Sequence, residues 1–227
     1  MTDHVLDRPM WHALTTRQAE HALTEGTALR YHTDIGPLAG IPDQSDASLI
    51  ALGELIQKTG NVALGGKVMP QLPPGAKFIH EGRYYQMLWE GPAPESGDSF
   101  DFIPLGAADS DEMIALTKLT NPGPFGSRTH VLGDYWGIRI DGQLAAMAGE
   151  RMKQQGYSEV SAVCTHPDHL GKGYAGALCR LLVRNALGRG DTPYLHVHDV
   201  NERAIKVYER LGFRVRETMN VAFAEPV

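Results

Sequence analysis

The chain has 227 residues, of which 42% are hydrophobic and 21% charged, and its formal net charge is -6. This composition is ordinary for a globular protein and excludes a disordered one. The acidic balance argues against nucleic acid as a partner and favours cationic or neutral substrates. No apolar run could span a membrane and the first residues lack the core of a signal peptide, so we expect a cytoplasmic protein with no membrane partner.

The first part of the chain predicts two helices. Thr15 and Gln18 have the spacing of a capping box, which would open a helix that continues to about residue 23. Ser45 or Asp46 is a suitable N-cap for a second helix, and Gly60 would end it.

Two strands are expected next, at residues 61–64 and 78–88. The second strand leads into an aromatic run of Tyr84, Tyr85 and Trp89. Aromatic residues of a strand are more often part of the core, but these could also line an acceptor pocket.

A domain boundary is predicted at the connector of residues 91–97. Its sequence, Gly-Pro-Ala-Pro-Glu-Ser-Gly, is typical of an exposed linker. We therefore predict a companion α/β domain at residues 1–98, of unknown role, and a second domain at residues 99–227.

The second domain shows a regular order of elements, in which Asp141-Gly142 is a strong hairpin signal and the Pro- and Gly-rich stretch 121–126 forces a loop. In chain order we expect a strand at 100–105, a helix capped by Asp109 or Ser110, strands at 135–140, 144–151 and 158–165, a helix that includes 177–183, a strand at 194–198, a helix from Asn201 and a strand at 214–224. Antiparallel hairpins followed by a helical crossover give a mixed sheet.

The most informative stretch runs from Val163 to Gly176, where a strand meets a glycine-rich loop and then a helix. Alternation predicts two faces for the strand: Val160, Ala162 and Cys164 on one, and Ser161, Val163 and Thr165 on the other. The strand, the loop and the helix N-terminus bring unpaired N–H groups and the positive end of the helix dipole to one point. The stretch therefore predicts a site for a phosphate group.

Gly171, Gly173 and Gly176 also match the G-x-G-x-x-G spacing of a dinucleotide-binding turn. In a Rossmann unit, however, the first glycine follows the first strand directly, and several βα repeats come after it. Here a segment with Pro167 separates the strand from Gly171, and too little chain follows for a doubly wound sheet. A nicotinamide-dependent enzyme is thus the less favoured alternative.

Beyond the loop, residues 201–213 have the pattern N-x-x-A-x-x-x-Y-x-x-x-G-F. Together with the loop, this pattern resembles the GNAT superfamily of acyl-CoA-dependent N-acyltransferases. The family's Q/R-x-x-G-x-G/A segment maps onto residues 170–175, with the departure that Leu170 stands where Arg or Gln is usual. The anchoring of the pyrophosphate should then fall on backbone amides. The resemblance covers about residues 99–227.

The resemblance implies a mixed α/β (α+β) fold, a splayed sheet flanked by helices, with the N-terminal domain as a degenerate half of the same fold or an unrelated companion. An extra domain ahead of the GNAT domain is similar to the glycine-N-acyltransferase branch. The implied activity is transfer of an acetyl group from acetyl-CoA, the cosubstrate, to the primary amine of a small molecule or amino acid in a ternary complex. A non-catalytic acyl-CoA sensor is the alternative function. The oligomeric state is left open, with a homodimer as one option.

By the same resemblance, one set of residues should hold coenzyme A. The end of the strand should bind the pantetheine arm, with one amide N–H facing the thioester oxygen, and the glycine loop should cradle the pyrophosphate. The residues are Val163, Cys164, Thr165, Leu170, Gly171, Lys172, Gly173, Tyr174, Ala175, Gly176 and Asn201. Lys172 is expected at the solvent rim.

Tyr208 is the implied proton donor to the departing thiolate, on the helix face that it shares with Asn201 and Ala204. Glu159 matches the position of the glutamate base in one branch of the family, and burial would raise its pKa to a useful value. Glu150 is the other candidate base, and a water chain could replace both.

The remaining candidates concern sulfur, metal and the acceptor. Cys164 and Cys179 are expected to be buried free thiols. His196 and His198 share a strand face, but no metal site is predicted, because Asp199 is the only further ligand that the sequence places nearby; packed or proton-relaying histidines are favoured. The loop 121–127 and the strand 135–140 are the predicted lip of the acceptor site.

Overall fold

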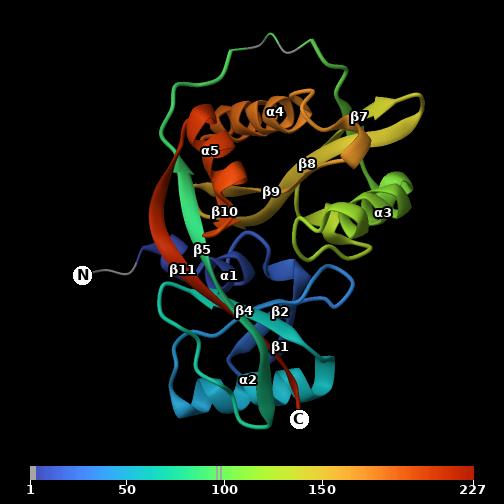
Figure 1. The fold of residues 1–227 in the computed structure, drawn as a ribbon. Helices are drawn as coiled ribbons and strands as arrows, with labels where there is room; N and C mark the ends of the chain where they lie inside the picture. The colour runs from blue at the N-terminus through green and yellow to red at the C-terminus, as the bar shows by residue number, and fades with distance from the viewer. Residues whose placement is uncertain (1–3, 96, 98) are drawn as a thin grey trace.

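The computed structural model describes residues 4–95, 97 and 99–227 (Figure 1). Its strands form one sheet in the spatial order β1-β2-β3-β4-β11-β5-β10-β9-β8-β7-β6. They are β1 (Ala22–Glu25), β2 (Ala28–Tyr31), β3 (Leu38–Gly40), β4 (Val62–Gly66), β5 (Ala76–Trp89), β6 (Ile103–Leu105), β7 (Tyr135–Ile140), β8 (Gln143–Gln154), β9 (Tyr157–Thr165), β10 (Thr192–His198) and β11 (Phe213–Pro226). Only the pairs β3–β4 and β9–β10 are parallel in the described sheet.

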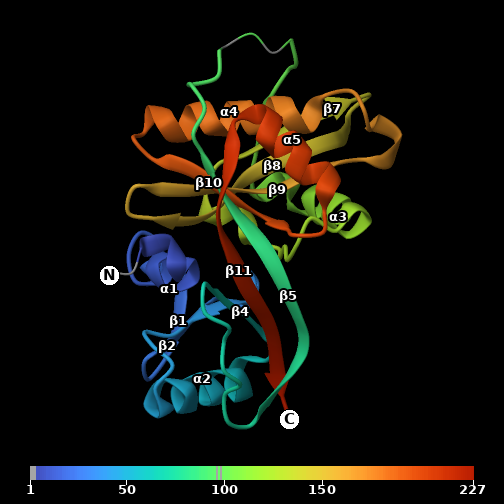
Figure 2. The ribbon, with the colours of Figure 1, turned by 60° about the vertical axis from the view of Figure 1, so that its left-hand side comes forward.

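The helices pack on both faces of this sheet. They are α1 (Pro9–Leu14), α2 (Asp46–Thr59), α3 (Ser110–Thr120), α4 (Tyr174–Gly188) and α5 (Glu202–Leu211). α4 and α5 lie on one side of β8 and β9 and α3 on the other, as Figures 1 and 2 agree. The predicted mixed fold of helices around a large sheet is confirmed. No helix in the described part of the chain is long and apolar enough to cross a membrane.

Separate apolar clusters fill the two faces. The cluster under α4 contains Leu178 and Leu182 of the helix and Leu195 of β10, and the cluster under α3 contains Met113 of the helix and Met147 of β8. These side chains are at most 1% exposed. Full burial of such a side chain contributes roughly 1.5–3 kcal/mol, so each helix is fixed firmly on its face of the sheet.

β5 connects the early and late parts of the chain. It pairs antiparallel with β10 on one edge and with β11 on the other, and β11 pairs with β4 on its far edge. Both long strands run from the α4 end of the molecule to the α2 end (Figure 2). The sheet is therefore continuous across the connector at 91–97. The predicted domain boundary at residue 98, which like residue 96 lies outside the described residues, stays a prediction.

The predicted helix at Thr15 is wrong, whereas the second helix is confirmed. The first helix, α1, begins with Pro9 and ends where the Thr15 hydroxyl donates to the carbonyl of Trp11, 2.8 Å away. The buried amide of Gln18 instead donates to backbone carbonyls of the sheet region, among them that of Arg151 at 2.7 Å. In α2, Ser45 is the N-cap and Gly60 follows the last turn, as expected.

The predicted faces of the β9 strand are wrong in part, because the strand contains a β-bulge. Met147 of β8 lies opposite Cys164, and Gly149 lies opposite Ser161, so β9 carries one extra residue between these pairs. Ala162 takes up the irregularity with φ of 52°. An extra residue inverts the alternation. Val160 therefore packs in the cluster under α4, while Ala162 and Cys164 pack in the cluster under α3.

Candidate active site

The sheet opens between β9 and β10. These parallel strands pair at three positions, the last being Tyr194 opposite Glu159. Beyond Tyr194, β10 pairs with β5 on its other edge but no longer with β9. The β10-facing edge of β9 beyond Glu159 is thus available to a ligand. Its six residues, Val160 to Thr165, include the three predicted to bind a pantetheine arm.

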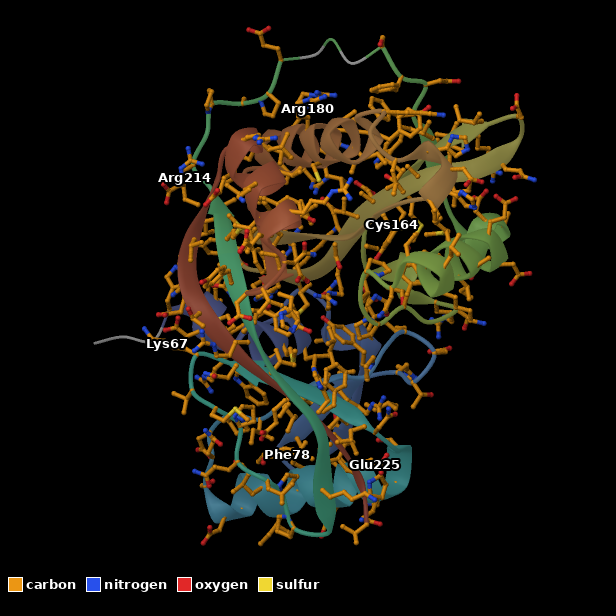
Figure 3. The ribbon with its side chains drawn as sticks, viewed as in Figure 1. Lys67, Phe78, Cys164, Arg180, Arg214 and Glu225 are labelled. Carbon is orange, nitrogen blue, oxygen red and sulfur yellow. The ribbon has the colours of Figure 1, made fainter. Side chains whose placement is uncertain are left out.

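A cleft of about 1380 Å³ occupies this opening. It extends from the glycine loop and α5 to the N-terminal part of the chain. Figure 3 shows Cys164 between α4 and α3, well removed from Phe78 and Glu225 at the α2 end of the long strands. All the residues predicted to hold coenzyme A line the cleft, namely Val163, Cys164, Thr165, Leu170, Gly171, Lys172, Gly173, Tyr174, Ala175, Gly176 and Asn201. The fold therefore brings together residues from β9, the loop, α4 and the N-cap of α5.

The glycine loop has the backbone geometry of an anion site. Gly171 and Gly173 have φ of 78° and 84°, which side-chain-bearing residues rarely adopt, and Gly173 is the N-cap of the fifteen-residue α4. The N–H groups of the first turn of a helix have no partner within the helix and favour a negative charge. Leu170 is 52% exposed, and the exposed Lys172 ammonium lies 2.9 Å from Nδ1 of His169, at the rim as expected.

α5 places Tyr208 across the cleft from β9. The side chain of Asn201 accepts from the N–H of Ala204 and so fixes the start of the helix, as predicted. The Tyr208 ring packs edge-on against Phe213 with centroids 6.0 Å apart. Burial, and then the nearby Cys179 and Cys164, raise the pKa of Tyr208 above its usual value. The phenol is therefore protonated at neutral pH and can act there as a proton donor but not as a base.

The two cysteines are free and buried, as predicted. Burial raises the pKa of Cys164 to about 11 and that of Cys179 to about 12. A thiol must lose its proton to act as a nucleophile. At neutral pH both are therefore packing groups that line the cleft.

The expectation of a raised pKa for Glu159 is wrong. The carboxylate is fully buried, accepts from Nε and Nη2 of Arg151 at 2.9 and 2.7 Å, and lies 2.8 Å from Nδ1 of His196. Burial alone would raise its pKa, but the charge of Arg151 and the hydrogen bonds from Arg151 and His196 lower it to about 2. Such a carboxylate is a weak proton acceptor, and it does not line the cleft among the described residues.

Glu150 is also engaged in ion pairs. Its buried carboxylate lies 2.7 Å from Nζ of Lys153 and contacts Nη2 of Arg189. Both proposed carboxylate bases thus have structural cations as partners, which favours a base from elsewhere in the cleft.

We expect Glu159→Gln to destabilise the fold by about 3 kcal/mol at neutral pH, because it leaves the buried Arg151 without its counter-charge. The folded-state pKa of Glu159 lies below the ordinary value of 4.5. The stabilisation is therefore complete above about pH 4.5 and is lost as the pH falls toward 2. Urea unfolding from pH 7 to pH 2.5 measures this, and the difference in unfolding free energy between variant and wild type should narrow as the pH falls. The control Glu112→Gln, which breaks an exposed pair with Arg139, should cost less than 1 kcal/mol at every pH. A gap that is constant with pH would contradict the assignment.

The histidines of β10 have different partners. His196 is bound to Glu159 and lies 3.1 Å from Nε2 of Gln86, whereas His198 is partly exposed in the cleft with Nδ1 3.3 Å from Oδ1 of Asp199. Asp199 is held in turn by Nε of Arg83 at 3.0 Å. The described residues contain no group of three His, Cys, Asp or Glu side chains that could hold a metal ion.

The far end of the cleft contains residues that the sequence prediction missed. Arg151 lines it from β8 and His80 lines it from β5, on the same strand as Tyr84, which the sequence did indicate as a pocket residue. Gly82 stands between these two, and a Cβ there would lie 3.4 Å from Nε2 of His80 and 3.8 Å from Nε2 of His198. The signal in the sequence was that His80, Gly82 and Tyr84 occupy alternate positions of one strand, which places them on the same face of the sheet.

Other acceptor predictions hold only in part. Tyr85 and Trp89 pack in the cluster under α4, and of the aromatic run Tyr84 alone lines the cleft among the described residues. The loop after α3 lines the cleft through residues 121–124, but no described residue of β7 does so. β8 lies between β7 and β9 and so keeps β7 away from the opening.

Comparisons with known proteins agree with this architecture. The family model of FR47-like proteins matches residues 135–221. A solved structure of a GNAT-family protein from Novosphingobium aromaticivorans is 38% identical, with a TM-score of 0.92 over 99% of this chain and 100% of the other. A GCN5-related N-acetyltransferase from Kribbella flavida is 17% identical, with a TM-score of 0.62 over 98% and 94% of the two chains, and shows the same fold. No curated protein matches the chain.

The fold, the opened sheet and these similarities define an acyltransferase. The chain belongs to the GNAT family.

Proposed function

We propose that the chain is an N-acetyltransferase that moves an acetyl group from acetyl-CoA to the primary amine of a small molecule or amino acid. The observation that carries the proposal is the glycine loop at the N-terminus of α4, beside the opening between β9 and β10. One half of such a site suits a pyrophosphate and the other an extended pantetheine arm.

In this proposal, Gly171, Gly173 and Gly176 let the backbone approach the pyrophosphate. Leu170 provides no polar contact, but Lys172 and Arg180 line the same end of the cleft and add positive charge. The exposed edge of Val163 to Thr165 pairs with the pantetheine amides, and one N–H there stabilises the thioester oxygen as it gains charge.

The chemistry needs a proton acceptor for the amine and a donor for the thiolate. The amine nitrogen forms the new bond to the acetyl carbon, the carbon–sulfur bond breaks, and Tyr208 donates its proton to the departing sulfur. His198 is the better candidate base than either glutamate, because its ring lines the cleft and its Nδ1, which accepts from the N–H of Val200, lies 3.3 Å from Oδ1 of Asp199. The alternative is an acyl-CoA sensor, which would use the same cradle without turnover.

Calorimetry and thiol release test the proposal. Acetyl-CoA should bind and raise the Tm, NAD should not, and an amine should release free thiol from acetyl-CoA. Gly173→Val should weaken acetyl-CoA binding at least tenfold, since φ of 84° and the close backbone cradle exclude a branched side chain. The control Gly188→Ala, which places a Cβ in open space at the end of α4, should bind normally. Stabilisation by NAD alone would refute the proposal, and binding without release from any amine would favour the sensor.

A further inference from the structure

Arg151 presents one edge of its guanidinium to the cleft. Its other edge, Nε and Nη2, is bound by both oxygens of Glu159. Nη1 makes no hydrogen bond within the described part of the chain and lies 4.0 Å from the point where a Cβ on Gly123 would sit, at the loop that borders the cleft. The side chain is 15% exposed. The edge formed by Nη1 and Nη2 is therefore oriented by Glu159 and open to a ligand.

A guanidinium can bind two carboxylates, one on each edge, because its donors form a planar fork that matches the two oxygens. Glu159 occupies the first edge and is itself held by His196 and by the N–H of Met152. The arrangement fixes the plane of the guanidinium before any ligand arrives, which lowers the ordering cost of binding.

The charge of the cleft favours an anion. None of the described residues that line it is acidic, although the whole chain has a net charge of -6. Its cations are Arg151, Lys172, Arg180, Arg203 and Arg210. The last four belong to the loop, α4 and α5, where the phosphates of a coenzyme would lie, and Arg151 alone is on the β8 side. The expectation of a cationic acceptor, drawn from net charge, is therefore not supported by the wall of the cleft.

The surroundings of Arg151 suit a small organic acid. Tyr84 and His198 line the same cleft as Arg151, and the rings of Tyr84 and His198 lie 4.9 Å apart. A Cβ on Gly82 would already contact His80, Tyr84 and His198 at 3.4 to 3.8 Å, and these three side chains line the cleft. We place the carbon skeleton of an acceptor against them.

We propose that the acceptor carries a carboxylate near its amine and that the free edge of Arg151 binds it, with Glu159 as a positioning residue. This inference rests on the proposed acetyl transfer. It assigns the substrate as an amino acid or related amino-carboxylate and excludes polyamines and simple alkylamines as preferred acceptors.

Matched acceptor pairs test the inference on the unmodified protein. Glycine and glycinamide, phenylalanine and phenylalaninamide, and 4-aminobutyrate and butylamine differ in the carboxylate but keep the amine. With acetyl-CoA, at least one acid should show kcat/KM about 100-fold above its neutral partner, because loss of a desolvated bidentate charge pair has effects of that size. Polyamines should be poor acceptors.

Two variants locate the effect. Arg151→Lys keeps the charge but has no second edge, and the double variant Arg151→Met/Glu159→Gln removes both buried charges together, so neither is left unpaired. Each should raise KM for the acid at least tenfold, reduce its preference over the neutral partner, and leave the Kd of acetyl-CoA unchanged. Arg139→Lys, whose partners Asp109 and Glu112 lie on the surface of the α3 region, is the control and should keep the preference.

The outcomes separate this inference from the proposed function. Acetyl-CoA binding with equal or better turnover of neutral amines would overturn the carboxylate inference and leave acetyl transfer standing. Binding without turnover of any amino-carboxylate would also overturn it. Absence of acetyl-CoA binding in calorimetry would overturn the proposed function itself. A variant that keeps the full acid preference would remove Arg151 from the acceptor site.

Discussion

Tyr208→Phe is expected to lower kcat about 100-fold while acetyl-CoA binds with unchanged Kd. The ring should still pack against Phe213, so the helix stays in place, and only the hydroxyl is lost. General acid catalysis contributes roughly 10²–10⁴-fold, and the phenol, whose pKa is raised by burial, is protonated throughout the neutral range, so kcat should show no titration of Tyr208 there. Stopped-flow thiol release and calorimetry on the same preparation measure the two quantities.

Tyr85→Phe is the matched control for this experiment. Tyr85 packs against the same apolar cluster but does not line the cleft among the described residues, so its hydroxyl should not affect kcat. A Tyr208→Phe protein with wild-type kcat would remove the proton-donor role. Weaker acetyl-CoA binding with unchanged kcat would instead assign Tyr208 to coenzyme binding.

His198→Gln is expected to reduce kcat/KM for the amine about 100-fold near neutral pH. Glutamine keeps a polar side chain beside Asp199 but cannot take a proton from the incoming ammonium. The loss should shrink as the pH rises toward the pKa of the acceptor, since more of the amine is then already neutral. Initial rates between pH 6 and pH 10 provide this profile.

A merely structural role for His198 predicts a different profile. The deficit would then be independent of pH and would be accompanied by a lower Tm. His21→Gln, in the turn that precedes β1, is the control and should keep wild-type kinetics. Full activity of His198→Gln across the range would leave a chain of water molecules as the base.

The parts of the fold that could be predicted are those with local signals. Ser45 and Gly60 delimit α2, Asn201 caps α5, and the glycines before α4 allow its loop, and each depends only on residues a few positions away. The bulge at Ala162 could not be predicted, because alanine has no preference for φ of 52° and the conformation is imposed by pairing with β8.

The same limit applies to the candidate site. The glycine loop and Tyr208 lie on segments with characteristic spacing, whereas the state of Glu159 depends on Arg151, which only the folded sheet brings into contact. The charge of the cleft likewise differs from that of the whole chain, because none of the described acidic residues is part of its lining. The net charge sums over all residues and therefore does not describe the charge of the residues that line one cleft.

The position of β5 has a consequence for how the molecule reaches this structure. Both of its neighbours, β10 and β11, are synthesised more than a hundred residues later, so the strand emerges from the ribosome with two open edges. Non-local pairing of this kind folds slowly and exposes aggregation-prone strands in the meantime. Lys77, Glu81 and Arg83 interrupt the apolar sequence of β5, as charged residues do in strands that must wait for a partner. The acyl-transfer cleft, which borders this strand, can therefore form only after translation has passed residue 213.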